Sequence, residues 1–418
     1  MPGRILAHPM RPSAPLVTIV LHIGFVVAGM ATTLLGPILP ALTERWRMSD
    51  VVAGSLFTAQ FLSAMTATLV APALAGRIGA RGALALGFTL LAMGIVTIGL
   101  APHAVGVLAT VVYGLGLGFV LPLTNIAVAA AQPDRAASAL SLVNVSWGVG
   151  AVLWPIAVRS LGSVESVAAP TSALAMACAV MALACRVVIP AALLSAPRST
   201  DGADHGGAKA PPPLLSQKAE APSPHLPPHA TMARSGMVGR AVLLGTLIFL
   251  YVGTENAVAG WVAEFARRMV AGATTTWALA PTAFWAALTT GRLLAAVALR
   301  RITESALIRS GLVLATLGVV AITFAASTPG GVIAGAAATG LGLSAIFPLL
   351  WALVTRSVGA LAPAAAGPLY AAGGLGGAVM PWVVGAVSSA VGDLRAGLVV
   401  PLGALLVLLA LSSLKASR

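Results

Sequence analysis

Charged residues are scarce in this sequence. Asp, Glu, Lys and Arg make up only 8% of the 418 residues, while hydrophobic residues make up 58%; roughly 25% of an average soluble domain is charged. So few charges cannot cover a surface in water, which excludes an ordinary soluble protein. The net charge of +13 does not predict nucleic-acid binding, because the basic residues lie in short segments between apolar runs, where we interpret them as signals of membrane topology.

Sequence signals of catalysis are also missing. Cys178 and Cys185, the only two cysteines, fall in one predicted helix roughly 10 Å apart along its axis, which is too far for a disulfide. The six histidines are scattered, and no Gly-Lys pair is present to form a phosphate-binding loop. We see no metal-ligand or catalytic-triad spacing, and we therefore expect no enzyme activity, no cofactor and no metal.

Long apolar runs fill most of the chain. Each is long enough to cross about 30 Å of hydrocarbon as a helix, and a helix satisfies its own backbone hydrogen bonds in lipid. The first run follows Arg4 and Arg11 as a signal peptide would, but it continues to about residue 42, so we interpret it as a membrane helix. The sequence predicts an all-α membrane protein with 12 transmembrane helices. They span residues 16–42, 51–75, 83–101, 105–131, 136–159, 169–193, 240–266, 273–299, 304–327, 330–356, 362–388 and 393–414.

The distribution of basic residues predicts the orientation. With a cytoplasmic N-terminus, 17 of the 24 Lys and Arg fall on the cytoplasmic side, six fall outside, and Arg292 lies within a span. This bias follows the positive-inside rule and places both termini in the cytoplasm. The composition, rich in Ala, Gly and Arg, hints at a bacterium with GC-rich DNA, so we expect a multi-pass protein of the bacterial inner membrane, and a monomer.

Residues 194–236 differ from the rest of the chain. They are rich in Pro, Ala, Ser and charge, as in Pro211-Pro212-Pro213, and cannot bury a core, so we predict a disordered cytoplasmic linker. This linker separates an N-terminal six-helix bundle, residues 1–193, from a C-terminal six-helix bundle, residues 237–418.

The two predicted bundles resemble each other in sequence. Residues 114–123 are GLGLGFVLPL and residues 340–349 are GLGLSAIFPL, which agree at six of ten positions with an offset of 226. The same offset relates Gly148 to Gly374 and Pro155 to Pro381. Such a 6+6 repeat implies a pseudo-two-fold axis along the membrane normal and a central site that opens to either side by rocking, which is how transporters work.

At this level the whole chain resembles the major facilitator superfamily. The loop Gly76-Arg77-Ile78-Gly79-Ala80-Arg81 is similar to the superfamily's loop motif with its R-x-G-x-R core. The resemblance implies structural or gating roles for Arg77 and Arg81, although Gly76 stands where the motif usually has Asp.

Within the superfamily the chain most resembles the fucose–proton symporters. The segments that carry this resemblance are Gly36-Pro37-x-x-Pro40, Gly116-x8-Asn125, Asn144-x-x-Trp147-Gly148-x-Gly150, and Tyr251-Val252-Gly253-Thr254-Glu255 opening into Gly260-Trp261. The sugar symporters of that branch use acidic residues in helices one and four. Neither predicted helix has one here, and Leu121 occupies the approximate position in helix four, so their mode of proton coupling does not transfer unchanged.

Glu255 is the acidic residue that we predict deepest in a span, roughly 22 Å along the helix from Arg240. A charge in hydrocarbon costs at least about 2.5 kcal/mol, so Glu255 is a candidate for proton coupling or substrate binding; a structural carboxylate is the alternative. Arg292, roughly 12 Å from Arg300, is a candidate structural or gating residue that can extend to the cytoplasmic interface; binding of an anionic substrate or of Glu255 is the alternative. The two estimated depths differ, so we do not expect a direct Glu255–Arg292 pair.

Amides and aromatic rings in the spans are candidates for substrate binding. Amides need hydrogen-bond partners, which sugar hydroxyls offer as well as neighbouring helices do, and sugars stack on aromatic rings. The candidates are Gln60, Asn125, Asn144, Trp147, Asn256, Trp261, Trp285, Trp351 and Tyr370.

The sequence thus predicts a secondary active transporter of a small solute, possible substrates including a monosaccharide, with protons as the coupling ion. An exporter of hydrophobic or drug-like compounds is one alternative. A non-transporting membrane receptor or scaffold is another. The expected partners are the small-molecule substrate, protons and the lipid bilayer.

Overall fold

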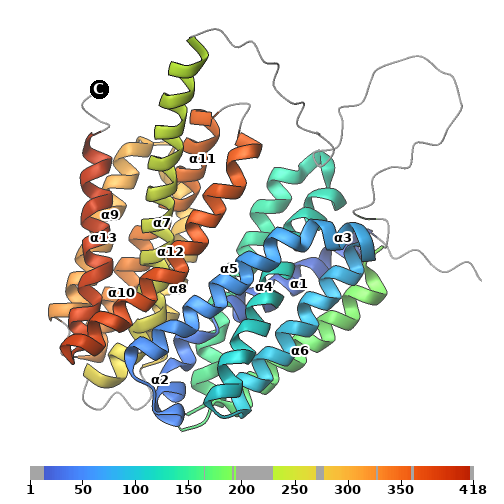
Figure 1. Ribbon diagram of the computed structural model, residues 1–418, viewed down its shortest axis with the longest axis horizontal. Helices are drawn as coiled ribbons and strands as arrows, with labels where there is room; N and C mark the ends of the chain where they lie inside the picture. Colours follow the sequence, from blue (N-terminus) through green and yellow to red (C-terminus); the bar gives the residue numbers. More distant parts are fainter. Residues whose placement is uncertain are drawn as a thin grey trace, which may run out of the picture.

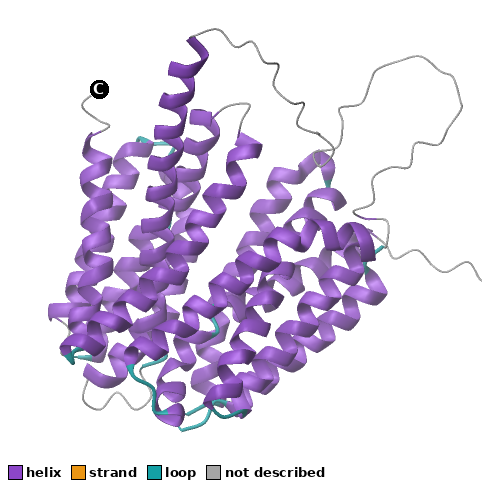
Figure 2. Cartoon of the chain, in the orientation of Figure 1, coloured by secondary structure: helices purple, strands orange, loops and turns teal. Residues whose placement is uncertain are grey.

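The protein is all-helical in the part of the chain that the structure describes. The computed structural model describes residues 14–163, 165–190, 193, 229–269, 277–325, 328–358 and 362–414. Within these ranges no residue belongs to a strand (Figure 2), so the prediction of an all-α protein is confirmed.

The helices fall into two sets, before and after the undescribed residues 194–228. The first set is α1 (Ala14–Thr32), α2 (Leu35–Trp46), α3 (Asp50–Leu100), α4 (His103–Ala131), α5 (Ala136–Leu161) and α6 (Ala168–Val188). The second set is α7 (His229–Met269), α8 (Leu279–Ala298), α9 (Glu304–Val320) with a π-helical turn (Ala321–Ala325), α10 (Pro329–Leu343), α11 (Ile346–Val358), α12 (Ala362–Val391) and α13 (Leu394–Leu414). We call them the N-half and the C-half.

Two of the predicted helices are each divided in two by proline. A proline lacks the N–H that would bond to the carbonyl four residues earlier, and its ring clashes with that carbonyl. Pro37 acts in this way on Thr33, where α1 ends and α2 begins, and Pro348 acts on Ser344, between α10 and α11. The predicted single helices 16–42 and 330–356 are therefore each a pair of shorter helices.

In α3, by contrast, two helices that the sequence predicts as separate, residues 51–75 and 83–101, form one continuous element. The break between them is confined to Gly79, whose φ of 76° and ψ of 160° are not helical. Glycine adopts this positive φ without a steric penalty, so a single residue turns the chain. Helix continues on both sides of it, over 51 residues in all.

Ten stretches of the described chain are long and apolar enough to cross a membrane. The chain is therefore a multi-pass membrane protein, although the predicted count of twelve spans is not reached by this criterion. Large apolar side chains on the outer surface agree with a lipid environment: Leu69 is 78% exposed and Leu183 is 66% exposed, which would be unfavourable over so many helices in water. Cys178 and Cys185 are buried and free, as predicted.

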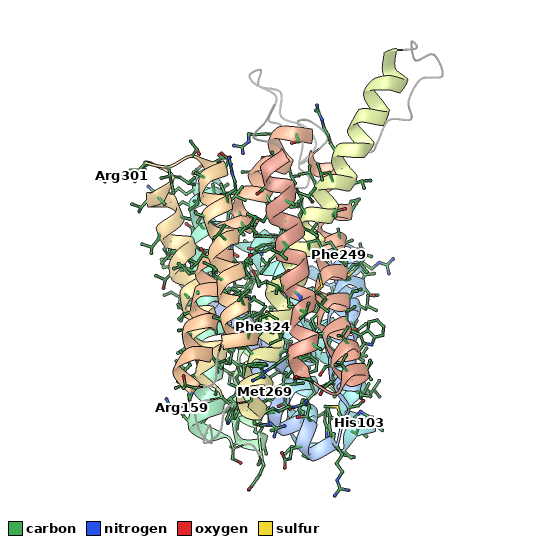
Figure 3. The ribbon with its side chains drawn as sticks, turned by 90° about the vertical axis from the view of Figure 1, so that its left-hand side faces the viewer. His103, Arg159, Phe249, Met269, Arg301 and Phe324 are labelled. Atoms are coloured by element: carbon green, nitrogen blue, oxygen red, sulfur yellow. The ribbon has the colours of Figure 1, made fainter. Side chains whose placement is uncertain are left out.

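The two halves lie side by side, meet at one end and diverge toward the other (Figure 1). At the convergent end lie α2, Met269 and His103, and Arg301 lies at the divergent end (Figure 3). The helix α7 extends past its neighbours at the divergent end (Figure 1). It begins at His229, so residues 229–236 of the predicted linker are helical, and the remainder of the predicted linker lies outside the described residues.

Small residues allow helices to pack closely within and between the halves. A Cβ atom on Gly118 of α4 would lie only 2.1 Å from the carbonyl oxygen of Ala64 in α3, and one on Gly36 of α2 would lie 2.6 Å from the carbonyl oxygen of Ala259 in α7. Backbones can approach this closely only where a side chain is absent, as is common between membrane helices.

Candidate functional site

A partly buried network of charged residues joins the halves at the convergent end. Its members are Glu44, Asp50, Glu264, Arg267 and Arg268, and we call it the Glu264 network. Glu264 is completely buried in α7. It accepts hydrogen bonds from Arg267 at 2.6 and 2.9 Å and from Arg268 at 2.5 Å, so both arginines compensate its charge within the helix.

The same arginines reach across to the N-half. Arg268 donates two hydrogen bonds to the Asp50 carboxylate, at 2.6 and 3.0 Å, and Arg267 lies 3.5 Å from Glu44. Ser388 of α12 donates to Asp50 at 2.5 Å. Asp50 is also the first residue of α3, where a negative charge interacts favourably with the helix dipole. A fork-shaped guanidinium that binds a carboxylate through two parallel hydrogen bonds is a strong and geometrically specific contact.

Backbone contact closes this end further. A Cβ atom on Gly385 of α12 would lie 2.2 Å from the carbonyl oxygen of Asp50, and one on Gly54 of α3 would lie 2.8 Å from the Cα atom of Trp382. The N–H of Val51 also donates to the Ser389 hydroxyl at 2.9 Å. Helices α3 and α12 therefore touch along their backbones here.

Sequence analysis did not identify the Glu264 network. One signal was available: Glu264 precedes Arg267 and Arg268 by three and four residues, the spacing at which helical side chains pair. The partner Asp50 is 218 residues away from Arg268, and nothing local in the sequence indicates that contact.

Nearer the middle of α7, a second carboxylate lies between the halves. Glu255 is 8% exposed and accepts a short hydrogen bond from the Tyr251 hydroxyl. One guanidinium nitrogen of Arg292, in α8, lies 3.5 Å from the same Glu255 oxygen, so the expectation that these two residues do not pair was wrong. The estimated depth of Glu255 takes Arg240 as the start of the helix. The helix α7 begins eleven residues earlier, at His229, so Arg240 does not mark its end.

Arg292 also contacts the N-half. Its guanidinium carbon lies 5.7 Å from the centre of the Trp147 ring in α5, a distance at which a cation and an aromatic face attract. Trp147 in turn packs edge-on against Trp285, with ring centres 5.6 Å apart, and its indole donates to the Thr32 hydroxyl at 3.2 Å. We call Trp147, Tyr251, Glu255 and Arg292 the Glu255 cluster.

A small cavity of about 20 Å³ adjoins this cluster on the side of the convergent end. It has room for about one water molecule and is far smaller than the roughly 300–1,000 Å³ of ligand pockets, so in this conformation it is a narrow polar gap between the halves. Both halves line it, with polar side chains and aromatic rings. The lining includes Thr32, Phe57 and Gln60 from the N-half and Asn256, Gly260 and Trp285 from the C-half.

A row of aromatic rings continues from Tyr251 on the other side of the cluster. Tyr251 stacks on Phe347 with ring centres 5.7 Å apart, and Phe347 stacks on Trp351 at 6.2 Å. Trp351 meets Tyr370 edge-on at 4.5 Å, and the Tyr370 side chain is 55% exposed. The rings come from α7, α11 and α12.

The structure thus brings many of the predicted binding residues together and leaves others apart. Gln60, Asn256 and Trp285 line the cavity, and Trp147, Trp351 and Tyr370 belong to the cluster or to the aromatic row. Asn144 is exposed on α5, where its amide donates to the Leu140 carbonyl at 2.7 Å. Asn125 is half-buried in α4, where its amide donates to the Leu121 carbonyl at 3.1 Å.

Trp261 lies elsewhere. Its ring is fully buried and its indole donates to the carbonyl of Pro381 at 2.9 Å, within the C-half. Trp154 makes the corresponding contact within the N-half, to the carbonyl of Leu34 at 3.0 Å. Both rings tie two helices of one half together, and neither faces the cavity. Arg77 and Arg81 are exposed beside the Gly79 break.

The architecture defines a multi-pass membrane transporter with a small polar and aromatic cavity between two helical halves. The family model of the Major Facilitator Superfamily matches residues 21–381, and the chain belongs to this superfamily, as the sequence resemblance predicts. It is therefore a transporter, not an enzyme. A comparison with curated protein sequences finds no match.

Solved structures of other members share the fold at low sequence identity. A bacterial homologue of the human lysosomal transporter Spinster, in an inward-facing and unoccupied conformation, is 15% identical, with a TM-score of 0.76 and 97% of each chain covered. The nucleoside transporter NupG is 14% identical, with a TM-score of 0.73 over 97% of this chain and 99% of NupG. FucP in its outward conformation is 15% identical, with a TM-score of 0.58 over 95% of this chain and 98% of FucP.

Proposed function

We propose that the chain is a secondary active transporter that crosses the membrane twelve times in two pseudo-symmetric bundles of six. The ten apolar stretches become twelve crossings if α3, with 51 residues, crosses twice and if α8, which carries Arg292, also spans. A crossing needs about 20 residues, which both helices supply. By the positive-inside rule the divergent end is cytoplasmic, with both termini on that side of a bacterial inner membrane, and the protein acts as a monomer.

In this orientation the conformation is closed to the outside and open to the cytoplasm. The Glu264 network and the contact of α3 with α12 support closure at the outer end. The divergence of the halves at the other end (Figure 1) supports an inward-facing state. The higher TM-score with the inward-facing Spinster homologue, 0.76, than with outward FucP, 0.58, agrees with it. Alternating access then requires the Glu264 network to open when the cytoplasmic side closes.

The transported solute binds between the halves beside the Glu255 cluster, where the small cavity widens to admit it as the halves move, and Glu255 carries the coupling proton. The observation that carries this proposal is the position of Glu255: a buried carboxylate, contacted by Tyr251 and Arg292, between rings and amides that come from both halves. Arg292 links Glu255 to Trp147 of the N-half, so the protonation of Glu255 and solute binding can be coupled to the relative motion of the halves. Hydroxyl-bonding amides beside Trp147 and Trp285 suit a monosaccharide.

Uptake into proteoliposomes tests the proposal. Radiolabelled monosaccharides are offered with and without an inward proton gradient, and we expect the gradient to drive accumulation of at least one of them. The Glu255→Gln variant, which keeps the shape and cannot bind a proton, should lose the accumulation. The matched control is Glu304→Gln, because Glu304 is an exposed acid at the start of α9 and should leave uptake unchanged.

Export of hydrophobic compounds is the second candidate, and the aromatic row from Tyr251 to Tyr370 favours it. If folded wild-type protein takes up no monosaccharide under either condition, but moves an apolar dye out of vesicles, the row and not the amides is the binding surface.

A further inference from the structure

We propose that Arg292 binds a carboxylate of the transported solute, so that the substrate class is a sugar acid and not a neutral sugar. The inference rests on the proposed function, in that it places the solute at the same cavity. It is carried by the contacts of Arg292, which differ from those of Arg267 and Arg268 in the Glu264 network.

Arg292 makes fewer hydrogen bonds than its N–H donors allow. A guanidinium has five N–H donors in a planar fork. The Nε atom of Arg292 is buried and has no hydrogen-bond partner among the described residues. Its approach to Glu255, at 3.5 Å, is longer than an N–H···O hydrogen bond, and the Glu255 oxygen that it approaches already accepts a hydrogen bond from Tyr251.

The guanidinium is nevertheless held in place. Trp147 covers it at 5.7 Å, and 28% of its side chain remains exposed. Arg292 therefore offers an oriented fork to the space between the halves. Such a fork matches the two oxygens of a carboxylate.

The surroundings of Arg292 suit hydroxyl groups. Trp285, Thr289 and Arg292 lie on one face of α8, at spacings of four and three residues. The Thr289 hydroxyl is buried without a partner among the described residues, and it lies against Gly148 of α5. The same face thus carries a ring, a hydroxyl without a partner and a cation, in that order toward the cytoplasm. The Trp285 ring is 4% exposed and the Thr289 hydroxyl is covered by α5, so a solute reaches them when the halves move apart there.

Charge balance supports the same conclusion. Tyr251 and Arg292 are the titratable groups that contact Glu255 in the described part of the chain. When Glu255 takes up the coupling proton, Arg292 loses its only anionic neighbour there. An unpaired charge at this depth is unfavourable. A carboxylate on the solute restores the balance, so proton and anion bind together, whereas a neutral sugar leaves the cation uncompensated.

Two matched pairs of probes test the inference by isothermal titration calorimetry on the purified full chain. D-glucuronate is compared with D-glucose, and D-galacturonate with D-galactose; within each pair only the carboxylate differs. We expect at least one acid to bind wild-type protein, and its neutral partner to bind roughly 10-fold more weakly or not at all. Arg292→Gln should weaken binding of that acid by roughly 10- to 100-fold.

A conservative variant guards against a folding defect. Arg292→Lys keeps the positive charge beside Glu255 but loses the planar fork, so it should bind the acid with an affinity between those of wild type and Arg292→Gln. Arg309→Gln is the matched control, because Arg309 is half-buried on α9 and donates to the Ser305 carbonyl of the same helix, so its loss should leave binding of the acid unchanged.

Three results would overturn the inference: no binding of either acid, equal binding of acid and neutral sugar, or unchanged binding of the acid by Arg292→Gln and Arg292→Lys. Uptake of a neutral monosaccharide that binds as well as its acid would overturn this inference and leave the proposed transport intact. Binding of an acid through Arg292 without any uptake would contradict the proposed transport and leave this inference intact.

Discussion

Two glutamates nine residues apart on α7 have opposite surroundings. Glu264 is fully buried and is bound by both Arg267 and Arg268, which also hold Asp50 and Glu44 of the other half. Glu255 has one hydrogen bond from Tyr251 and one loose contact with Arg292. They lie roughly 13 Å apart along the helix axis. The surroundings of Glu264 pair its charge with two arginines, whereas those of Glu255 leave N–H donors of Arg292 without a partner.

The difference assigns separate roles to the two sites. A network with its charges paired across the halves stabilises one conformation and has nothing left to bind a ligand. A cluster with an unpartnered nitrogen beside a cavity can exchange partners during transport. We therefore propose that the Glu264 network serves closure and that the Glu255 cluster serves binding.

Removing the charge of Glu264 should have the largest conformational effect. Glu264 accepts a hydrogen bond from the Thr43 hydroxyl of α2 at 3.3 Å and orients the two arginines that reach Asp50 and Glu44, so Glu264→Gln weakens the contact between the halves. Breaking a buried pair in this way costs roughly 3–5 kcal/mol. Because states of a transporter differ by only a few kcal/mol, the outward-open state should become the major one. Spin labels at Arg159→Cys and Arg395→Cys, both exposed on opposite halves, should report a longer distance. The native cysteines are buried and should not be labelled. An unchanged distance distribution would show that the network does not hold the outer end closed.

A smaller opening should follow from Gly385→Ala. The new methyl group would meet the carbonyl oxygen of Asp50 at 2.2 Å, so α12 and α3 must separate, at a cost of roughly 1–3 kcal/mol. The same pair of labels should show a partial shift toward the longer distance. Gly403→Ala is the control, since a Cβ atom there has nothing within 4 Å. Equal behaviour of the two variants would mean that backbone contact adds nothing to closure.

The smallest effect is expected for the exposed pair of Glu304 and Arg356. Their hydrogen bonds include one of 2.9 Å, but the two side chains are 44% and 55% exposed, and exposed ion pairs contribute little. Glu304→Gln should leave both the label distances and the thermal unfolding temperature unchanged within error. A clear loss of thermal stability would show that short contacts alone, without burial, set the strength of these ion pairs.

The sequence was informative where the signal was local. Apolar runs predicted an all-α membrane protein, and Glu255 was singled out because an acid is costly in such a run. Pro37 and Pro348 could also have predicted the helix breaks four residues before each. The pairing of Arg292 with Glu255 was missed because it depends on how far α7 extends, and α7 continues back to His229.

Long-range contacts could not be predicted from the same patterns. Asp50 meets Arg268 only because α3 and α7 pack at the convergent end, and neither residue signals the other. Trp261 and Trp147 are alike in the sequence as tryptophans within apolar helices. Only the packing distinguishes them. The Trp261 indole donates to the Pro381 carbonyl, whereas the Trp147 ring contacts Arg292 of the other half.

Proton movement is the most direct test of the separate roles of the two glutamates. A pH-sensitive dye trapped in proteoliposomes measures proton entry when the solute identified by uptake is added outside. The account predicts acidification of the interior by wild-type protein, none by Glu255→Gln, and a retained proton-to-solute ratio in Glu264→Gln even if its rate falls. Undiminished acidification by Glu255→Gln, or a lost ratio in Glu264→Gln, would contradict it.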